Sequence, residues 1–312
     1  MRKALRIGLR LFIFLFIVAN AIAFLHAYKF THFTEEGIPR TGNESLSFPQ
    51  KLKILFTGVD FPRPKTKSLP RQSYETVYIQ SNVRLETWLQ RAPNARGTVL
   101  IFHGYGGEKS GMLPVSDAFI QLGYNTLLVD FMGSGGSGGN QTTIGFTEAQ
   151  EVKDCMVYLE QAGFSNLFLF GTSMGAVAIM KAVQDHNLQP SGLFLECPFG
   201  TMTETVKARF RTMKVPPFPM AFLLLFWGSV QNGYWTFAHD GETYAKSISC
   251  PVLLLYGEKD VKVSRAETDA IYANLAGPKK LVTFPLAGHE SYIRRYPAEW
   301  TAAVKDALSR AR

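Results

Sequence analysis

Three residues in the second half of the sequence are of the types that perform nucleophilic catalysis together. Ser173 lies in the run Gly171-Thr-Ser-Met-Gly175, and Asp260 and His289 each follow a later apolar run. A serine hydroxyl is a poor nucleophile unless an imidazole accepts its proton. The imidazole in turn needs a carboxylate to fix its tautomer and to stabilise its cation. The order Ser173, Asp260, His289, with acid and base at the ends of later strands, therefore predicts a catalytic triad.

The segment around Ser173 has the form of a nucleophile elbow. Apolar residues 167–170 precede it, and the helix-forming residues 176–182 follow it. In such a strand–turn–helix unit the serine adopts a strained backbone conformation, and glycine at positions 171 and 175 lets strand and helix approach closely. The pattern Gly-x-Ser-x-Gly also occurs by chance in ordinary turns. The catalytic interpretation therefore depends on the rest of the chain.

A second informative segment follows the apolar, β-branched residues 97–102. It reads His103-Gly-Tyr-Gly-Gly107, and a glycine-rich turn at this place can direct backbone N–H groups into an oxyanion hole. An ordinary turn and a phosphate loop are the alternatives. Glu108 precedes Lys109-Ser110 where a phosphate loop requires glycine, so that motif fails. We expect the backbone N–H groups of Tyr105 and Met174 to be the two oxyanion donors.

Several other polar residues compete for a catalytic role and are interpreted as structural. His103 lies in the oxyanion turn and is expected to support it by hydrogen bonds. Asp130 ends a strand but is more typical of a loop carboxylate. The glycines at 133, 135 and 138 match the dinucleotide fingerprint, yet no helix opens from them before Thr147.

The composition excludes some partners and cofactors. The formal net charge is +8, and half of it comes from Arg2, Lys3, Arg6 and Arg10. The remainder has no Lys/Arg run, so we expect no nucleic acid partner. The three cysteines are far apart and fit no metal-binding spacing, which predicts free thiols and no metal. The predicted chemistry needs no organic cofactor, and the sequence does not specify the oligomeric state.

The N-terminus carries an apolar run from residue 11 to 25 behind a basic flank. We interpret residues 1–30 as a single-pass transmembrane anchor, because Phe24 and Leu25 prolong the run. A cleaved signal peptide is the alternative, with Ala21-Ile-Ala23 as the cleavage site and a secreted product. In both cases the basic flank stays in the cytoplasm and the catalytic domain lies on the non-cytoplasmic side.

The rest of the chain divides into two parts. Residues 31–71 are rich in Pro, Gly, Lys and Ser and predict a stalk or linker. Residues 72–312 alternate strand-like and helix-like segments, which predicts an α/β domain with a mostly parallel sheet flanked by helices. The pattern breaks at residues 200–240, where we predict a small helical lid insertion; an ordinary core helix is the alternative. Phe222 and Phe226 are expected to contact an acyl chain beneath this lid.

From about Tyr74 to Arg312 the sequence resembles the α/β-hydrolase family, especially its serine aminopeptidase and monoacylglycerol lipase-like branch. The resemblance rests on the oxyanion turn, on the elbow around Ser173, on residues 250–260 and on Gly288-His289. Met132 stands where the branch usually has arginine, which puts its loop contacts in doubt but not the triad. The resemblance implies an α/β-hydrolase fold and the hydrolysis of a small-molecule carboxylic ester. The apolar lid segment and the nearby anchor favour a lipid-like acyl group.

Two other functions remain open at this point. One is a serine aminopeptidase-like peptidase, although the sequence singles out no charged anchor for a peptide terminus. The other is a non-catalytic binding protein on a hydrolase scaffold, since a fold does not determine a function.

Overall fold

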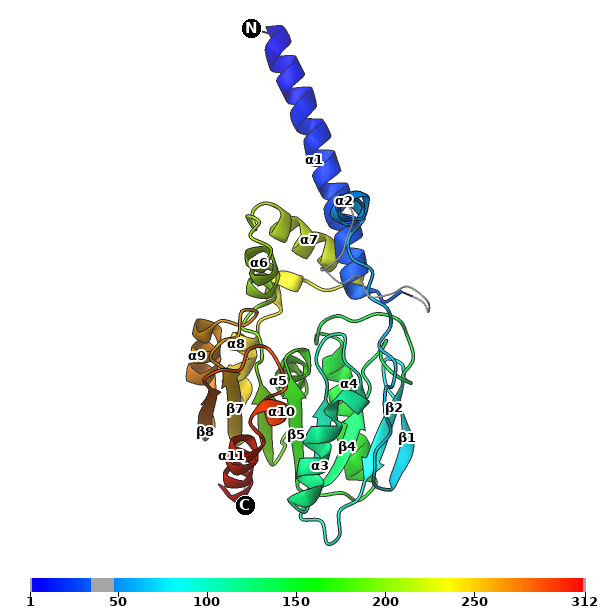
Figure 1. The fold of residues 1–312 in the computed structure, drawn as a ribbon, viewed down its shortest axis with the longest axis vertical. Coiled ribbons are helices and arrows are strands. Elements are labelled where there is room, and N and C mark those ends of the chain that lie inside the picture. The colour runs from blue at the N-terminus through cyan, green and yellow to red at the C-terminus, as the bar shows by residue number, and fades with distance from the viewer. Residues whose placement is uncertain (1, 35–47, 311–312) are drawn as a thin grey trace.

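The computed structural model describes residues 2–34 and 48–310. Its centre is an eight-stranded sheet with the strand order β1-β2-β4-β3-β5-β6-β7-β8 (Figure 1). The first hairpin is antiparallel, β2 also pairs antiparallel with β4, and all other neighbours are parallel. The strands are β1 (Tyr74–Gln80), β2 (Arg84–Gln90), β3 (Thr98–Phe102), β4 (Asn125–Val129), β5 (Leu167–Thr172), β6 (Gly192–Glu196), β7 (Val252–Gly257) and β8 (Lys279–Phe284). The mostly parallel sheet predicted from the sequence is therefore present.

Helices cover both faces of the sheet, because side chains alternate between the faces along each strand. On β3, Leu100 and Phe102 belong to one apolar cluster with α4, α5 and α9, whereas Val99 and Ile101 belong to a second cluster with α3 and α11. The helices are α1 (Arg2–Thr31), α2 (Phe48–Thr57), α3 (Leu113–Gln121), α4 (Glu148–Gln161), α5 (Met174–His186), α6 (Met202–Thr212), α7 (Met220–Asn232), α8 (Gly241–Tyr244), α9 (Arg265–Asn274), α10 (Tyr292–Arg295) and α11 (Pro297–Arg310), with short 3-10 turns η1 (Lys109–Met112), η2 (Thr236–Ala238) and η3 (Ala245–Ser247).

Helices α6 and α7 lie between β6 and β7 in the sequence and project from the sheet domain beside α1 (Figure 1). They occupy the region predicted as a lid. Ala221 and Leu225 of α7 are buried, whereas Phe222 and Phe226 are 39% and 43% exposed. These two rings are therefore only partly covered by the protein, and their contact with an acyl chain stays a prediction. Because α7 is apolar on every side, its sequence gave no signal for which side faces inward.

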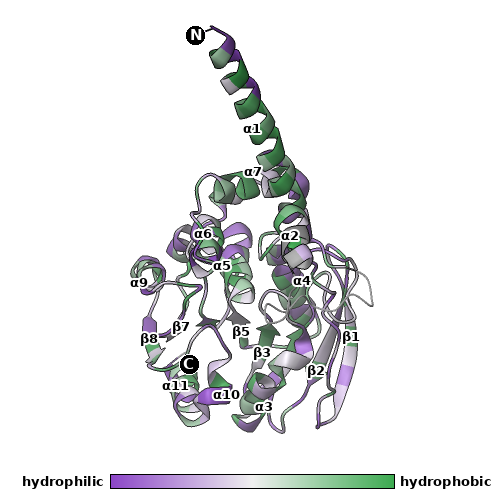
Figure 2. Cartoon of the chain, turned by 45° about the horizontal axis from the view of Figure 1, so that its top comes forward, coloured by the Kyte–Doolittle hydropathy of each residue, from purple (hydrophilic) through white to green (hydrophobic). Residues whose placement is uncertain are grey.

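Helix α1 has two parts with different surroundings. Residues 11–17 are exposed and extend away from the domain as an apolar rod (Figure 2). The C-terminal part packs on α7: Trp227 Nε1 donates to Asn20 Oδ1 at 3.1 Å, and Gln231 Nε2 donates to the Phe24 carbonyl at 2.8 Å. The helix is long and apolar enough to cross a bilayer.

The segment predicted as a stalk contains helix α2, which the sequence analysis did not anticipate. Residues 35–47 of that segment lie outside the described residues. Further along, the Arg63 guanidinium donates to the carbonyls of Ser137 and Gly139. The backbone N–H groups of Lys67 and Ser68 donate to Ser110 Oγ at 3.1 and 3.3 Å. Residues 63–68 therefore lie against the sheet domain.

Candidate active site

Ser173 occupies a strained turn between β5 and α5. Its backbone angles are φ 53° and ψ −113°, a region that non-glycine residues rarely adopt. A Cβ added at Gly171 would lie 2.6 Å from the backbone of residues 175 and 176, and one at Gly175 would lie 2.6 Å from the Phe102 carbonyl oxygen. Only glycine allows this close approach of strand and helix. The turn thus has the geometry that the elbow pattern predicts.

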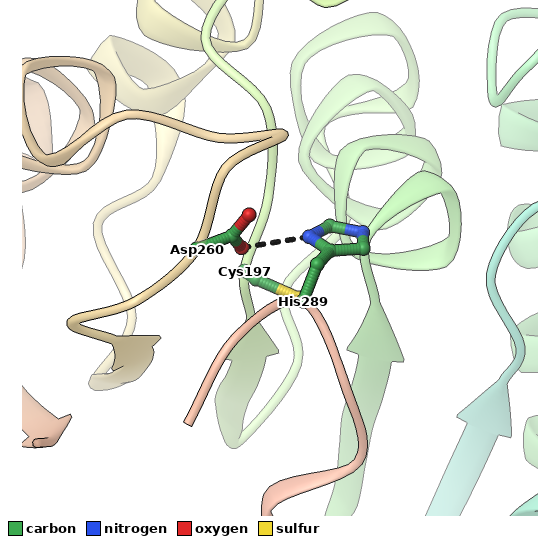
Figure 3. Close-up of side chains that lie close together, drawn as sticks. All are labelled: Cys197, Asp260 and His289. Atoms are coloured by element: carbon green, nitrogen blue, oxygen red, sulfur yellow. Dashed lines mark hydrogen bonds and ion pairs between the residues drawn. The ribbon is translucent and has the colours of Figure 1, made fainter. Parts of the chain in front are cut away.

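The structure brings Ser173, His289 and Asp260 into one hydrogen-bonded chain. His289 Nε2 lies 3.0 Å from Ser173 Oγ, and His289 Nδ1 lies 2.7 Å from Asp260 Oδ2 (Figure 3). Asp260 Oδ1 also accepts from the N–H groups of Lys262 and Val263, at 2.8 and 3.0 Å. The carboxylate is fully buried, whereas the imidazole is 16% exposed. The acid is therefore fixed by three donors, while the imidazole remains accessible beside the serine.

Cys197 follows β6, and its side chain lies close to those of Asp260 and His289 (Figure 3). Its Sγ and one ligand atom each of Asp260 and His289 lie within 4.8 Å of one another, which is a grouping that could hold a metal ion. Burial raises the pKa of the Cys197 thiol well above its usual range, so the thiol stays protonated.

The predicted oxyanion turn lies against the elbow. A Cβ added at Gly104 would be 3.5 Å from Ser173 Cβ. The backbone N–H of Tyr105, the next residue, therefore lies close to the serine. Met174 is the first residue of α5, where backbone N–H groups lack an intrahelical acceptor. His103 supports the turn as expected: its Nδ1 lies 2.9 Å from the Gly104 carbonyl, and its Nε2 accepts from Phe131 N–H at 3.1 Å. Burial lowers the pKa of His103, which keeps the ring neutral for these two roles.

Asp130 has the structural role that was inferred from its position. Its carboxylate accepts from Lys109 N–H at 2.7 Å and from Gly136 N–H at 3.0 Å, and it forms an ion pair with the buried Lys109 ammonium. The same ammonium lies 2.7 Å from Glu86 Oε1. These contacts fix the glycine-rich loop rather than contribute to the chain at Ser173.

Glu151 is a buried carboxyl that binds the backbone of Met132. Its Oε2 accepts from Met132 N–H at 3.0 Å, and among the described residues no basic side chain pairs with it. Burial, reinforced by nearby Glu148, raises the pKa of Glu151 to about 8. The folded protein therefore keeps a proton at neutral pH that the unfolded chain loses.

This proton gives the first testable prediction. Because the pKa of Glu151 is higher in the folded state, the unfolding free energy is expected to fall as pH rises from about 4.5 to about 8. The Glu151→Gln variant should lose this pH dependence: between pH 5 and pH 9 the unfolding free energy of the wild type should fall by about 4 kcal/mol more than that of the variant. Urea unfolding at both pH values measures it. Glu160→Gln, an exposed site on the same helix, is the control; equal pH dependence of all three proteins would contradict the prediction.

Residues of α1 and α6 also reach the oxyanion turn, and the sequence analysis missed them. The Tyr105 hydroxyl donates to the Phe30 carbonyl at 2.8 Å, and the two rings stack with centroids 5.0 Å apart. The Arg209 guanidinium lies over the Phe30 ring at 3.8 Å. No local pattern could have revealed these contacts, because they join segments far apart in the sequence.

Comparison with known proteins shows which family and which folds this chain resembles. A model of the serine aminopeptidase S33 family matches residues 93–230, which include the oxyanion turn and Ser173 but not Asp260 or His289. An esterase from Pyrococcus furiosus, Pf2001, superposes with a TM-score of 0.65 and 24% identity, over 80% of this chain and 98% of that one. The likeness in structure confirms the α/β-hydrolase fold.

Two curated relatives match the chain in sequence. An uncharacterized protein of Bacillus subtilis, YqkD, is 27% identical over 188 residues, covering 59% of this chain and 62% of that protein. The lysophosphatidylserine lipase ABHD12 of Mus musculus is 26% identical over 202 residues, covering 62% of this chain and 49% of that protein. The chain thus spans less than two thirds of the length of either relative.

Proposed function

We propose that this chain, which has the α/β-hydrolase fold, is a membrane-anchored serine hydrolase that cleaves carboxylic esters through Ser173, His289 and Asp260. The observation that carries the proposal is the unbroken chain of hydrogen bonds from Ser173 Oγ through the imidazole to the buried carboxylate. The strained turn that presents the serine is the second support.

The proposed mechanism follows from this geometry. Ser173 Oγ attacks the acyl carbonyl while His289 Nε2 takes its proton, and His289 then returns the proton to the leaving alcohol. Asp260 holds the proton-bearing Nδ1 and stabilises the imidazolium. The N–H groups of Tyr105 and Met174 stabilise the oxyanion, each contributing roughly 3 kcal/mol to lowering the barrier. Water then attacks the acyl-enzyme while His289 takes its proton, and His289 returns that proton to Ser173 Oγ as the acid leaves.

Ester hydrolysis is preferred over peptide hydrolysis because the relatives and structural neighbours are named as a lipase and as esterases. The matched family is nevertheless named for an aminopeptidase, so a peptidase is the second candidate. A panel of p-nitrophenyl esters and aminoacyl p-nitroanilides separates the two. Turnover confined to the anilides would reject the proposal.

We expect the same panel to show a preference for octanoyl over acetyl esters of at least about tenfold in kcat/KM. Burial of a few additional methylene groups, at ~0.8 kcal/mol each, suffices for this ratio. The apolar α1 and α7 next to the site motivate the prediction. Equal cleavage of acetyl and octanoyl esters would contradict it.

We further propose that α1 remains attached as a single-pass anchor, with the hydrolase domain on the non-cytoplasmic side. Arg2, Lys3, Arg6 and Arg10 precede the apolar run, whereas Lys29 is the one lysine or arginine in the ten positions after it, and this excess sets the orientation. Cleavage after Ala23 would cut α1 inside its contact with α7 and remove the Asn20–Trp227 hydrogen bond. Sequencing the N-terminus of the membrane-fraction protein tests the anchor, and a start at Phe24 would refute it.

A further inference from the structure

Arg209 places a positive charge beside the candidate active site without a counter-charge. It lies in the last turn of α6 and is partly buried, with its guanidinium carbon 3.8 Å from the Phe30 ring centroid and 5.5 Å from that of Tyr105. Glu204, the one acid of α6, is already paired with Lys207 and Arg211 at 2.9 and 3.1 Å. Within residues 2–34 and 48–310, no carboxylate pairs with Arg209 and no acceptor receives a hydrogen bond from it.

The charge persists in this environment. Burial lowers the pKa of Arg209 to about 10, so the side chain remains protonated at neutral pH. The two aromatic faces offset part of the desolvation cost through cation–π attraction, but they accept none of the five N–H donors. A partly desolvated guanidinium with unused donors is suited to bind an anion that arrives with another molecule.

The position of Arg209 links it to the reacting centre. Tyr105, whose ring it contacts, follows Gly104, and Gly104 packs against Ser173. An anion held by Arg209 would thus lie on the oxyanion-turn side of the serine. The acyl chain of a lipid-like ester is apolar, so a charge on such a substrate belongs to its alcohol part.

We propose that Arg209 binds a phosphate or carboxylate on the alcohol part of the substrate and makes the enzyme selective for anionic amphiphilic esters. This inference rests on the proposed ester hydrolase function. Arg209 does not touch the ester bond that is cleaved, so it determines substrate specificity. Its removal should change the ratio of kcat/KM between anionic and neutral esters that have the same acyl chain.

The test compares three substrates with one acyl chain: a monoacylglycerol, its phosphate monoester and the corresponding acyl glycerate. For Arg209→Gln we expect kcat/KM to fall at least about tenfold on an anionic substrate and less than about threefold on the neutral one. Loss on the phosphate or on the glycerate identifies which anion is bound. Arg211→Gln, an exposed site on the same helix, should leave the ratios unchanged.

Two results would overturn the inference: an equal loss on all three substrates, which indicates a structural role, or no loss on either anionic ester. Failure of the wild type to cleave even the neutral ester would instead reject the proposed function itself. Thermal unfolding checks the fold, and Arg209→Gln should melt no lower than the wild type because it removes an uncompensated charge. If Arg209→Gln does not fold, Arg209→Lys keeps the charge without the planar fork and should still lose most of the anionic preference.

Discussion

Replacing Ser173 with alanine is expected to lower kcat for ester hydrolysis by ~10⁴ or more while the protein stays folded. The nucleophile is lost, and the remaining groups stabilise charge but form no acyl-enzyme. His289→Ala should cost about as much, because the base and the nucleophile act as one unit. Asp260→Asn should also abolish most turnover, since an amide cannot stabilise the imidazolium and favours the wrong tautomer. Steady-state kinetics with a p-nitrophenyl ester measures all three.

Cys197→Ala serves as the matched control for these variants. Its thiol lies within 4.8 Å of ligand atoms of Asp260 and His289, yet it takes no part in the proposed mechanism. We expect the kcat of Cys197→Ala to stay within about threefold of the wild type, because the thiol is neutral and transfers no proton in the mechanism. Near-normal hydrolysis by a folded Ser173→Ala protein would reject the mechanism.

Deleting residues 2–31 is expected to lower kcat/KM for a soluble short-chain ester about a hundredfold. Helix α1 provides the Phe30 carbonyl that holds the Tyr105 hydroxyl, and its removal also exposes the side of α7 that contacts Phe24. If Tyr105 N–H is one of two oxyanion donors, misplacing it should cost on the order of 10²-fold. The measurement is kinetics in detergent alongside thermal unfolding of the truncated protein.

Deleting only residues 2–15 is the control for this truncation. These residues are exposed and include the four basic residues of the N-terminal flank, so the variant should bind membranes less while its soluble-ester turnover stays within about twofold. Tyr105→Phe removes only the hydrogen bond from the hydroxyl to Phe30, so its kcat/KM should lie between those of the two deletion variants. Wild-type turnover after deletion of residues 2–31 would show that α1 is an anchor without influence on the site.

The sheet and the positions of Ser173, Asp260 and His289 could be predicted because each depends on a local sequence pattern. Continuous apolar runs identified the strands, and in a parallel sheet the ends of those strands meet at one edge. Ser173, Asp260 and His289 therefore had to lie near one another once each was assigned to a strand end.

The contacts of α1 and α7 could not be predicted in the same way. An apolar helix has the same sequence pattern whether it faces lipid or protein, so neither the burial of Leu225 nor the exposure of Phe226 had a signal. Arg209 and Glu151 were missed for a related reason. Their charges become informative only when burial without a counter-ion is known, and burial depends on contacts between distant segments.

Labelling with a fluorophosphonate probe tests the central claim most directly. The probe reacts with a serine only when the serine is activated by its base and the oxyanion site is formed. Ser173 Oγ should displace fluoride from the probe, so the folded full-length protein should gain the mass of one probe minus HF. Peptide mapping should place the adduct on Ser173, and Ser173→Ala and His289→Ala should remain unlabelled. A folded wild-type protein that stays unlabelled, or one labelled elsewhere with Ser173 unmodified, would contradict the account.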